Sequence, residues 1–230
     1  TKPWYKRLPA VISMKYADLV LPVSKFTMQE TLRWMQPKSI QVIYNGVNTE
    51  KFRPYGSSRK EDLVITVAGI DWSTLKRKGL LTFVKSAALV PEAKFAIIGL
   101  ERDDSAAYLK SIAPANVSFT GFISEEKLIE WYQRAKVYVQ ISAYESFGMS
   151  LAEAMLCECV PVAAMRGALP DVVGDTGYYV AWDDERGGAE GIRKALKSEN
   201  GARARERVEA CFSDQKRERE LVRAIGELIS

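Results

Sequence analysis

Histidine is absent from the 230-residue sequence, so imidazole general-base catalysis and histidine-ligated metal sites are excluded within this chain. Cysteine is scarce, and an odd count of three without the spacing of a disulfide framework fits a reducing cytosol. Cys157 and Cys159 could in principle hold a metal ion together. We expect them instead to be small apolar residues at the end of a buried helix.

Long apolar runs are also missing, since no stretch approaches the roughly 20 residues that a membrane-spanning helix needs. No cleavable signal peptide is visible, and the sequence starts with Thr1 rather than Met. We therefore expect a fragment of a longer cytoplasmic protein. The basic and aromatic residues at positions 2 to 7 leave open a peripheral contact with the cytoplasmic face of a membrane, although an ordinary surface strand is the simpler interpretation.

The net charge of +4 is too small to indicate a nucleic-acid partner, and no basic stripe is interleaved with aromatic residues. Near the carboxyl terminus, basic residues alternate with glutamates, which is the pattern of solvated helix faces. We therefore predict that the chain does not bind nucleic acid.

Short β-rich apolar segments alternate with helical patterns along the chain. Such segments are typical of strands buried on both faces, and they cover residues 19–23, 41–44, 63–69, 94–99, 117–121, 136–142, 159–164 and 177–182. Ser124, followed by Glu125 and Glu126, indicates the start of one intervening helix. The alternation predicts an α/β fold, namely a Rossmann-like doubly wound parallel sheet with helices on both faces.

A polar stretch rich in proline, glycine and serine, residues 53–59, follows the first two predicted strands. We interpret it as part of a linker, after which a new α/β domain runs to about residue 182. Helical patterns follow over residues 184–198, 202–211 and 213–229.

Ligands of open parallel sheets bind where strands end and loops lead into helices. One such loop runs from Gly69 to Gly79 and contains Lys76, Arg77 and Lys78 just before a predicted helix. Cations at a helix amino terminus oppose the helix dipole, and a bound diphosphate would resolve that conflict by accepting from both the cations and the free N–H groups. A solvated basic loop is the alternative interpretation.

A second loop carries Glu145 and leads into a helix predicted to start near Ser146 or Phe147 and to include Glu153. Gly148 in the first turn would let a ligand approach the free backbone N–H groups. Carboxylates at these two points could each bind a diol, one on a sugar and one on a ribose. Two ordinary surface or capping glutamates are the alternative.

A third loop, residues 164–173, combines a glycine turn with a short helix from Leu169 and Pro170. Taken in order, the motifs of the chain resemble the signature of glycosyltransferase family 4, a family of retaining enzymes with the GT-B fold. The motifs are Asn45–Pro54, Lys78-Gly79, Glu145–Met155, Pro161-Val162, Gly167–Val173 and Gly177. The resemblance covers roughly residues 17–182, and its most specific part is the pair of glutamates eight positions apart.

The resemblance implies that this chain is the carboxy-terminal donor-binding domain of such an enzyme. Residues 1–44 would end the amino-terminal acceptor domain, 45–62 would be a linker, 63–212 the nucleotide-sugar-binding domain and 213–230 a helix that crosses back. Catalytic roles are implied for Glu145, on the donor hexose, and for Lys78, on the diphosphate. The implied donor-binding residues are Gly69, Lys76, Arg77, Ile123, Phe147, Gly148, Met149, Ser150 and Glu153, with Ile123 near the nucleobase and Glu153 on the ribose.

One departure from the family pattern concerns the first loop. Family members usually carry an arginine directly after the glycine that matches Gly69, where this chain has Ile70, and the loop up to Lys78 is longer here. Lys76 or Arg77 would then have to supply the second positive charge.

The resemblance implies retaining hexosyl transfer from a UDP-, GDP- or ADP-linked sugar to a glycan, lipid or small-molecule acceptor. The motif Asp-x-Asp does not occur in the sequence, so we expect Lys78 and a helix start, rather than a metal ion or another cofactor, to hold the diphosphate. We expect the fragment alone to bind donor without turnover, and any membrane contact to come through the missing amino-terminal domain. A nucleotide-sugar epimerase of the same fold and a non-catalytic module that binds nucleotide sugars or proteins are the alternatives.

Overall fold

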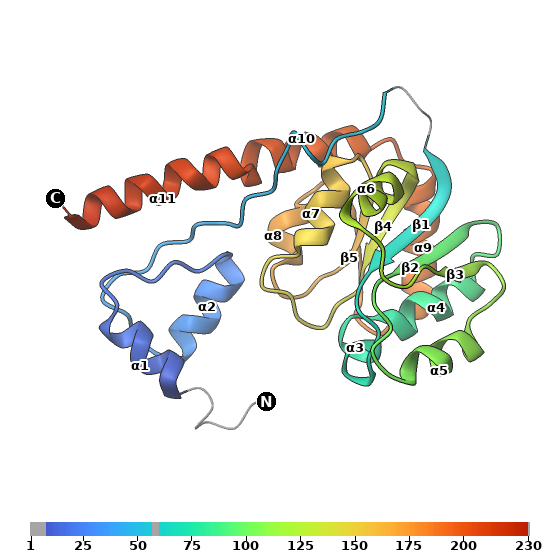
Figure 1. The fold of residues 1–230 in the computed structure, drawn as a ribbon, viewed down its shortest axis with the longest axis horizontal. Coiled ribbons are helices and arrows are strands. Elements are labelled where there is room, and N and C mark those ends of the chain that lie inside the picture. The colour runs from blue at the N-terminus through green and yellow to red at the C-terminus, as the bar shows by residue number, and fades with distance from the viewer. Residues whose placement is uncertain (1–7, 57–59, 230) are drawn as a thin grey trace.

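A computed structural model describes residues 8–56 and 60–229 of the chain, so the residues at positions 2 to 7 that were considered for membrane contact lie outside the described part. Six strands form one parallel sheet in the order β3-β2-β1-β4-β5-β6 (Figure 1). The strands are β1 (Glu61–Val67), β2 (Lys94–Ile98), β3 (Val117–Phe119), β4 (Ala135–Gln140), β5 (Val160–Ala164) and β6 (Tyr178–Val180). The predicted Rossmann-like doubly wound sheet is therefore confirmed.

The strands are buried on both faces, as their continuous apolar runs indicate. All of β5 is buried, and Val64 and Ile65, which point to opposite faces of β1, have no exposed surface. Each such side chain contributes about 1.5–3 kcal/mol through its burial. All six strands start and end within two residues of the predicted ranges, because a buried strand cannot be shifted without exposing its apolar side chains.

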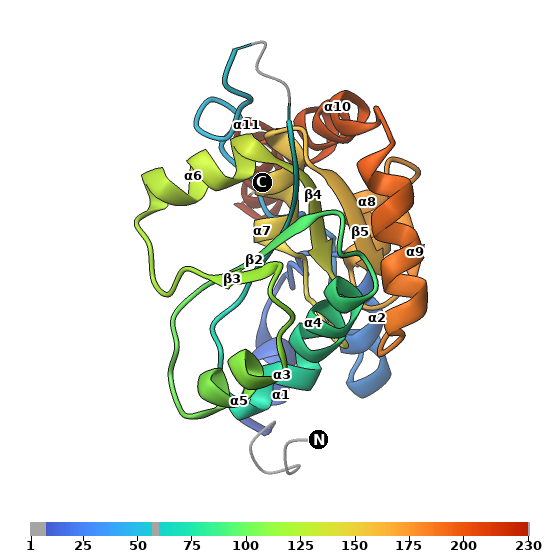
Figure 2. The ribbon, with the colours of Figure 1, turned by 90° about the vertical axis from the view of Figure 1, so that its right-hand side faces the viewer.

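Helices cover both faces of the sheet (Figure 2). On one face lie α4 (Leu80–Ala88) and α9 (Glu185–Leu196), with α3 (Trp72–Arg77) and α5 (Ser105–Ile112) beside α4. On the other face lie α6 (Glu125–Arg134) and α7 (Met149–Leu156), and α10 (Gly201–Phe212) packs against α7. The start of α6 is as predicted, since Ser124 accepts a hydrogen bond from the Lys127 N–H as its N-cap.

The amino-terminal segment lies apart from the sheet and contains α1 (Leu8–Tyr16) and α2 (Lys25–Trp34) (Figure 1). The strands predicted at 19–23 and 41–44 are wrong: in the described residues these segments meet through an isolated parallel bridge between Val20 and Ile40 and a hydrogen bond from the Ile43 N–H to the Pro22 carbonyl oxygen, and they form no regular strand. Pro22 cannot donate to a ladder, and the carbonyl oxygens of Ile43 and Tyr44 accept hydrogen bonds from the Arg217 side chain instead of from a neighbouring strand. The long helix α11 (Asp214–Ile229) extends from α10 alongside this segment.

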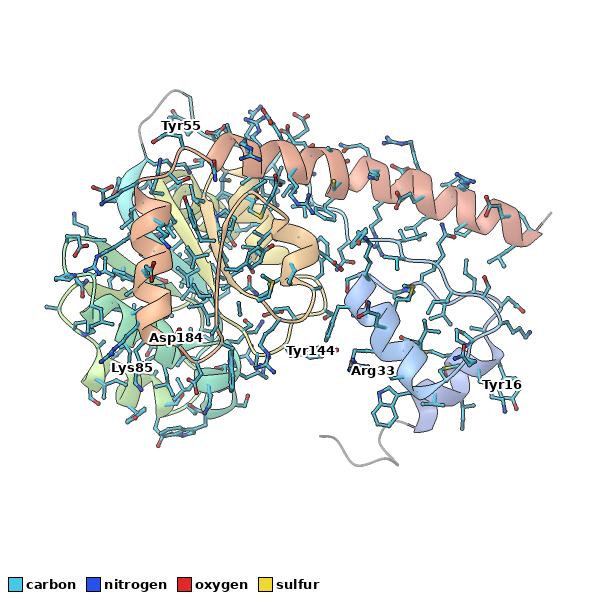
Figure 3. All side chains as sticks on the ribbon, turned by 180° about the vertical axis from the view of Figure 1, so that it is seen from behind. Tyr16, Arg33, Tyr55, Lys85, Tyr144 and Asp184 are labelled. Atoms are coloured by element: carbon cyan, nitrogen blue, oxygen red, sulfur yellow. The ribbon has the colours of Figure 1, made fainter. Side chains whose placement is uncertain are left out.

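The two parts touch at a few specific points. The backbone N–H of Lys25, at the start of α2, donates to Asp171 Oδ2 at 3.0 Å. Phe26 and Tyr144 meet edge to face with ring centroids 5.2 Å apart, and Figure 3 shows Tyr144 between the two parts. Contacts of this kind fix the orientation of α2 toward the loop that follows β4.

Residues 45–62, the expected linker, contribute to the core instead of only connecting two parts. Val47 is buried and pairs with Ser213 through an isolated bridge, and Phe52 packs against Tyr132 at 6.2 Å between centroids. Within the described part of this segment, the chain is thus held against α6 and the start of α11.

In the described ranges 8–56 and 60–229, no helix combines the length and the apolar character that a membrane-spanning helix requires. Cys157 and Cys159 are both buried, and the Cys159 thiol donates to the carbonyl oxygens of Tyr132 and Ala135. Burial raises the pKa of the Cys159 thiol. These contacts agree with a structural rather than a metal-binding role for the two cysteines.

Gly79 connects α3 to α4 where no side chain can be accommodated. Its φ is 73°, and a Cβ placed on it would lie 2.2 Å from the Ile141 carbonyl oxygen. We expect Gly79→Ala to lower the free energy of unfolding by about 2 kcal/mol or more. Urea denaturation measures this change.

The matched control is Gly226→Ala on α11, where nothing lies within 4 Å of an added Cβ. Because alanine favours a helix more than glycine does, the free energy of unfolding of this variant should rise by up to about 1 kcal/mol. Equal urea midpoints for Gly79→Ala and the unsubstituted chain would contradict the close approach at Ile141.

Candidate donor site at the carboxyl ends of the strands

The site lies where the strand order reverses. From β1 the chain proceeds outward through β2 and β3 and then crosses to β4 on the other side of β1. In doubly wound sheets, the loops that follow such a pair of strands diverge and leave room for a ligand. Here the two loops are tied together, because the Ala143 N–H donates to the Arg77 carbonyl oxygen at 2.8 Å.

This tie brings together the two predicted catalytic residues. Lys78 Nζ lies 2.6 Å from Glu145 Oε1, and both side chains are largely buried, with exposed fractions of 26% and 12%. Glu145 Oε1 also accepts a hydrogen bond from Gln140 Nε2 at 2.8 Å. With both donors on Oε1, the second carboxylate oxygen of Glu145 has no hydrogen bond to any described residue and can accept from a ligand.

The loop after β1 contains a helix of its own, α3, which sequence reasoning did not predict. Asp71 caps it by accepting from the Thr74 N–H, and the Thr74 hydroxyl accepts from the Asp71 N–H in return. Lys76 and Arg77 therefore lie in the last turn of α3, where the helix dipole favours cations. The expected conflict with a helix amino terminus is therefore wrong for these two residues. Lys78 lies between two helices, as the C-cap of α3 and directly before Gly79, the N-cap of α4.

Lys76 and Arg77 are both exposed, and the structure turns Lys76 away from Lys78. Lys76 Nζ lies 3.0 Å from Asp183 Oδ2 and 5.3 Å from the ring centroid of Trp182. Asp183 and Trp182 both follow β6. In the strand order, β4 with Glu145 lies between β6 and β1, and Gly69 follows β1. Lys76 is thus already engaged by an acid and an aromatic ring.

A different cation lies next to Gly69. Ile70 is 1% exposed and forms an isolated bridge with Glu101, which places the following Arg102 beside the end of β1. A Cβ built on Gly69 would lie 3.2 Å from Arg102 Nε. Arg102 is held only loosely, since its Nη1 lies 3.6 Å from Asp71 Oδ2 and 60% of its side chain is exposed.

Helix α7 begins at Met149, two to three residues later than predicted. Gly148 is its N-cap with φ 103°, and no side chain caps the first turn, so the exposed Met149 and partly exposed Ser150 begin a helix with free N–H groups. Phe147 is buried and packs against Phe212, with centroids 5.4 Å apart. Only the backbone of Phe147 can therefore face a ligand.

Glu153 lies on α7, and its carboxylate is hydrogen-bonded to a residue of α6. The Tyr132 hydroxyl donates to Glu153 Oε2 at 3.0 Å, and Tyr132 itself has no exposed surface. Burial raises the pKa of the Glu153 carboxyl, while the hydrogen bond from Tyr132 and the nearby Lys51 oppose that rise. Glu153 is thus a carboxylate in a poorly hydrated position, without a directly bonded cation in the described part of the chain.

Two further loops border the same edge. Ile123 is partly buried against the core, and the loop before it contains Gly121, whose carbonyl oxygen accepts from the Gly99 N–H at 3.2 Å. After β5, the predicted short helix is α8 (Leu169–Val173). Ahead of α8, the backbone of Gly167 contacts that of Glu145 so closely that a Cβ would lie 2.7 Å from the Glu145 carbonyl oxygen.

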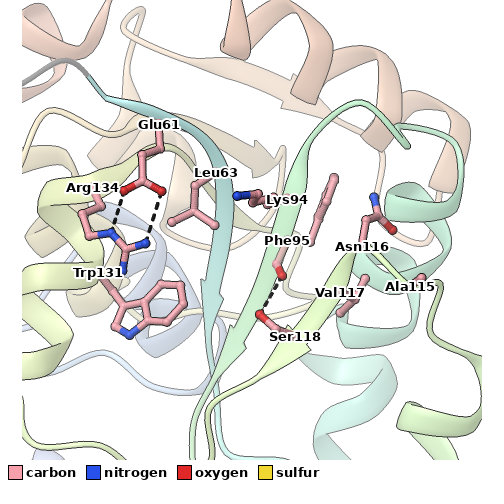
Figure 4. A pocket seen from close by; sticks show the side chains of 10 residues that line it. All are labelled: Glu61, Leu63, Lys94, Phe95, Ala115, Asn116, Val117, Ser118, Trp131 and Arg134. Carbon is pink, nitrogen blue, oxygen red and sulfur yellow. Dashed lines mark hydrogen bonds and ion pairs between the residues drawn. The ribbon is translucent and has the colours of Figure 1, made fainter.

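The described residues contain no group of three or more carboxylate, thiol or imidazole side chains placed to hold a metal ion. A cavity of about 320 Å³ lies at the opposite end of the sheet, at the amino-terminal ends of β1, β2 and β3 (Figure 4). Its walls include Trp131 and the ion pair between Arg134 and Glu61, and it contains none of the predicted site residues.

Sequence reasoning missed three residues of the site, namely Gln140, Tyr132 and Arg102. Gln140 had a signal, because an amide within an otherwise apolar buried strand needs a partner. Tyr132 fits the apolar stripe of its helix, and such a pattern indicates a core residue rather than a site residue. Arg102 had none, since only the pairing of Ile70 with Glu101 places it beside Gly69.

Comparison with known proteins identifies the family to which this chain belongs. The family described as glycosyl transferases group 1 matches residues 47–210. N-acetyl-alpha-D-glucosaminyl L-malate synthase of Bacillus anthracis is 27% identical over 224 residues, which cover 88% of this chain and 58% of that protein. GDP-mannose:cellobiosyl-diphosphopolyprenol alpha-mannosyltransferase of Xanthomonas campestris is 28% identical over 168 residues, covering 69% and 43%. This chain thus spans about half the length of these relatives.

Comparison with solved structures leads to the same family of proteins. Sucrose-phosphate synthase from Thermosynechococcus elongatus matches with a TM-score of 0.87 and 25% identity, over 99% of this chain and 62% of that one. Anabaena Alr3699/HepE in complex with UDP and glucose matches with a TM-score of 0.85 and 18% identity, over 96% and 66%. The fold is that of the carboxy-terminal half of GT-B glycosyltransferases, as expected from the sequence motifs.

The raised pKa of Glu153 implies a cost in stability. Below the ordinary carboxyl pKa the group is protonated in both the folded and the unfolded chain. The cost grows as the pH rises from that ordinary value, where the unfolded chain ionises first, and it is complete above the raised value. We expect Glu153→Gln, which can still accept from Tyr132, to stabilise the protein by about 1 kcal/mol at pH 8. The gain should shrink toward pH 4, as measured by urea denaturation at both pH values. A gain that is independent of pH would contradict the titration of Glu153.

Proposed function

Because this chain belongs to the glycosyl transferases group 1 family, we propose that the site between the β1 and β4 loops binds a nucleoside-diphosphate sugar as glycosyl donor. The observation that carries the proposal is the contact of Lys78 with Glu145 at the switch point of the sheet. The pair places a cation and a carboxylate with one free oxygen at the point where a diphosphate would join a sugar. UDP in one structural neighbour supports this ligand class.

The diphosphate would lie between Lys78 and the uncapped amino terminus of α7. Backbone N–H groups there, together with the dipole of the helix, favour an anion. Lys78 and Glu145 neutralise each other, so a second cation is needed for a doubly charged ligand. We assign this role to Arg102, whose guanidinium lies beside Gly69 and is bound only loosely to Asp71. Lys76 is engaged elsewhere, by Asp183 and Trp182.

The sugar and the ribose would extend in opposite directions from the diphosphate. The free oxygen of Glu145 would accept hydrogen bonds from hexose hydroxyls, and Glu153 from the ribose diol. The loop at Gly121 and Ile123 would border the nucleobase. Hydroxyls that each meet a fixed acceptor give the orientation on which transfer depends.

In transfer, the bond between the anomeric carbon and the diphosphate breaks while an acceptor hydroxyl attacks that carbon. Charge develops on the departing diphosphate, and Lys78, Arg102 and the α7 N–H groups would stabilise it without rearranging. This is the basis for proposing metal-independent transfer. Retention of the anomeric configuration follows from the resemblance to glycosyltransferase family 4.

The acceptor would be a glycan, a lipid or a small molecule carrying a hydroxyl group. The names of the relatives mention both L-malate and a diphosphopolyprenol, so both small and lipid-linked acceptors support this range. We propose a cytoplasmic enzyme whose acceptor-binding domain lies outside these 230 residues, as the partial coverage of its relatives supports.

Calorimetric titration with UDP, GDP and ADP tests the donor site. We expect one of them to bind, and Lys78→Ala and Arg102→Ala each to weaken that nucleotide by about tenfold to a hundredfold, the size of a lost hydrogen bond between charged groups. Affinity for the corresponding nucleoside should stay unchanged. Lys85→Ala, which removes an exposed cation of α4 (Figure 3), is the control and should change neither affinity.

Loss of nucleoside affinity in Arg102→Ala would place that residue at the base rather than at the diphosphate. Undiminished nucleotide affinity in Lys78→Ala, or no binding by the unsubstituted chain, would contradict the donor site as a whole.

The epimerase alternative makes a separate prediction. An epimerase would convert a nucleotide sugar without any acceptor, whereas a transferase domain leaves its configuration unchanged. We expect no epimer after incubation of the chain with UDP-glucose, GDP-mannose or ADP-glucose, as followed by proton NMR of the anomeric region. Detection of an epimer would favour the alternative enzyme.

A further inference from the structure

The Glu153 carboxylate is bound on one side by a buried hydroxyl that the proposed donor site does not yet use. We propose that Tyr132 is a positioning residue, whose hydroxyl holds Glu153 Oε2 so that Oε1 is presented to the two hydroxyls of a ribose. This inference rests on the proposed function, because it concerns how Glu153 recognises the nucleotide of the donor.

The geometry leaves Oε1 available. The Tyr132 hydroxyl donates to Oε2 at 3.0 Å, and Oε1 has no hydrogen bond to any described residue. Tyr132 has no exposed surface, so water does not compete for its hydroxyl. A glutamate with free rotation would have to be ordered when the ligand binds, whereas a glutamate already held at one oxygen avoids that entropic cost.

Tyr132 is held in place independently of Glu153. Its carbonyl oxygen accepts hydrogen bonds from Lys60 Nζ at 2.8 Å and from the Cys159 thiol at 3.1 Å. Its ring meets those of Phe52 and Tyr138 edge to face, at 6.2 Å and 6.0 Å between centroids. Because four neighbours fix the residue, the direction of its hydroxyl is set by the core and not by the glutamate.

The hydrogen bond also favours the form of Glu153 that a ribose needs. A hydroxyl donor on Oε2 stabilises the carboxylate over the carboxylic acid, and it opposes the rise in the pKa of Glu153 that burial causes. An ionised carboxylate accepts from both ribose hydroxyls at once, while the acid offers fewer acceptor positions.

Tyr138 provides a matched control. It is fully buried, lies next to Tyr132 in the same aromatic cluster, and its hydroxyl makes no hydrogen bond to Glu153. Tyr138→Phe and Tyr132→Phe therefore remove the same atom from the same environment, and only Tyr132→Phe removes a contact with Glu153.

The test is calorimetric titration of the 230-residue chain with UDP, GDP or ADP, whichever binds, and with the 2′,3′-dideoxy form of that nucleotide. We expect Tyr132→Phe to lower the affinity for the ribonucleotide about tenfold, which is the size of one hydrogen bond to a charged group. The affinity for the dideoxy form should fall less than twofold. Tyr138→Phe should leave both affinities within twofold of the unsubstituted chain. In the Glu153→Gln variant, adding Tyr132→Phe should not change the ratio of the affinities for the ribonucleotide and its dideoxy form any further.

The outcomes separate the inference from the proposed function. Ribonucleotide affinity that is unchanged in Tyr132→Phe, or an equal loss for both nucleotide forms, overturns the positioning role and makes Tyr132 purely structural. If Glu153→Gln abolishes the preference for the ribonucleotide while Tyr132→Phe retains it, only the role of Tyr132 fails. If the unsubstituted chain binds both forms equally, the ribose role of Glu153 fails, and the inference fails with it.

Discussion

The ion pair between Lys78 and Glu145 joins the two loops at the switch point, and the arrangement of the site depends on it. Both side chains are largely buried, so removing either one would leave an uncompensated charge in a poorly hydrated place. The backbone reinforces the pair, because the Ala143 N–H binds the Arg77 carbonyl oxygen and Gly167 fits closely against Glu145. The loops that follow β1, β4 and β5 are therefore joined to one another by direct contacts.

Strand β4 contributes polar groups to these joined loops at a cost. Gln140 and Ser142 lie on one side of the strand and its extension, and each has a buried oxygen without a hydrogen-bond partner among the described residues. Such groups are costly in a core and are concentrated at functional sites. The raised pKa of Glu153 has the same meaning, because an ionised carboxylate is kept where burial disfavours it.

The loop after β1 explains how the cations near the site are distributed. It contains α3 under the cap formed by Asp71, and Lys76 in the last turn of this helix contacts Asp183 and Trp182. The position next to Gly69 is then covered by Arg102 from the neighbouring loop. The cations near this end of the sheet thus come from the loops after both β1 and β2.

The sequence by itself determined the sheet, because continuous apolar runs and helix caps such as Ser124 are local signals that burial and hydrogen bonding enforce. It also named Lys78, Glu145 and Glu153, since each lies in a short motif. The partners of these residues were decided by the tertiary structure alone. Gln140, Tyr132 and Arg102 reach the site through strand pairing and helix packing between segments distant in sequence, and no local pattern records which side chains such packing brings together.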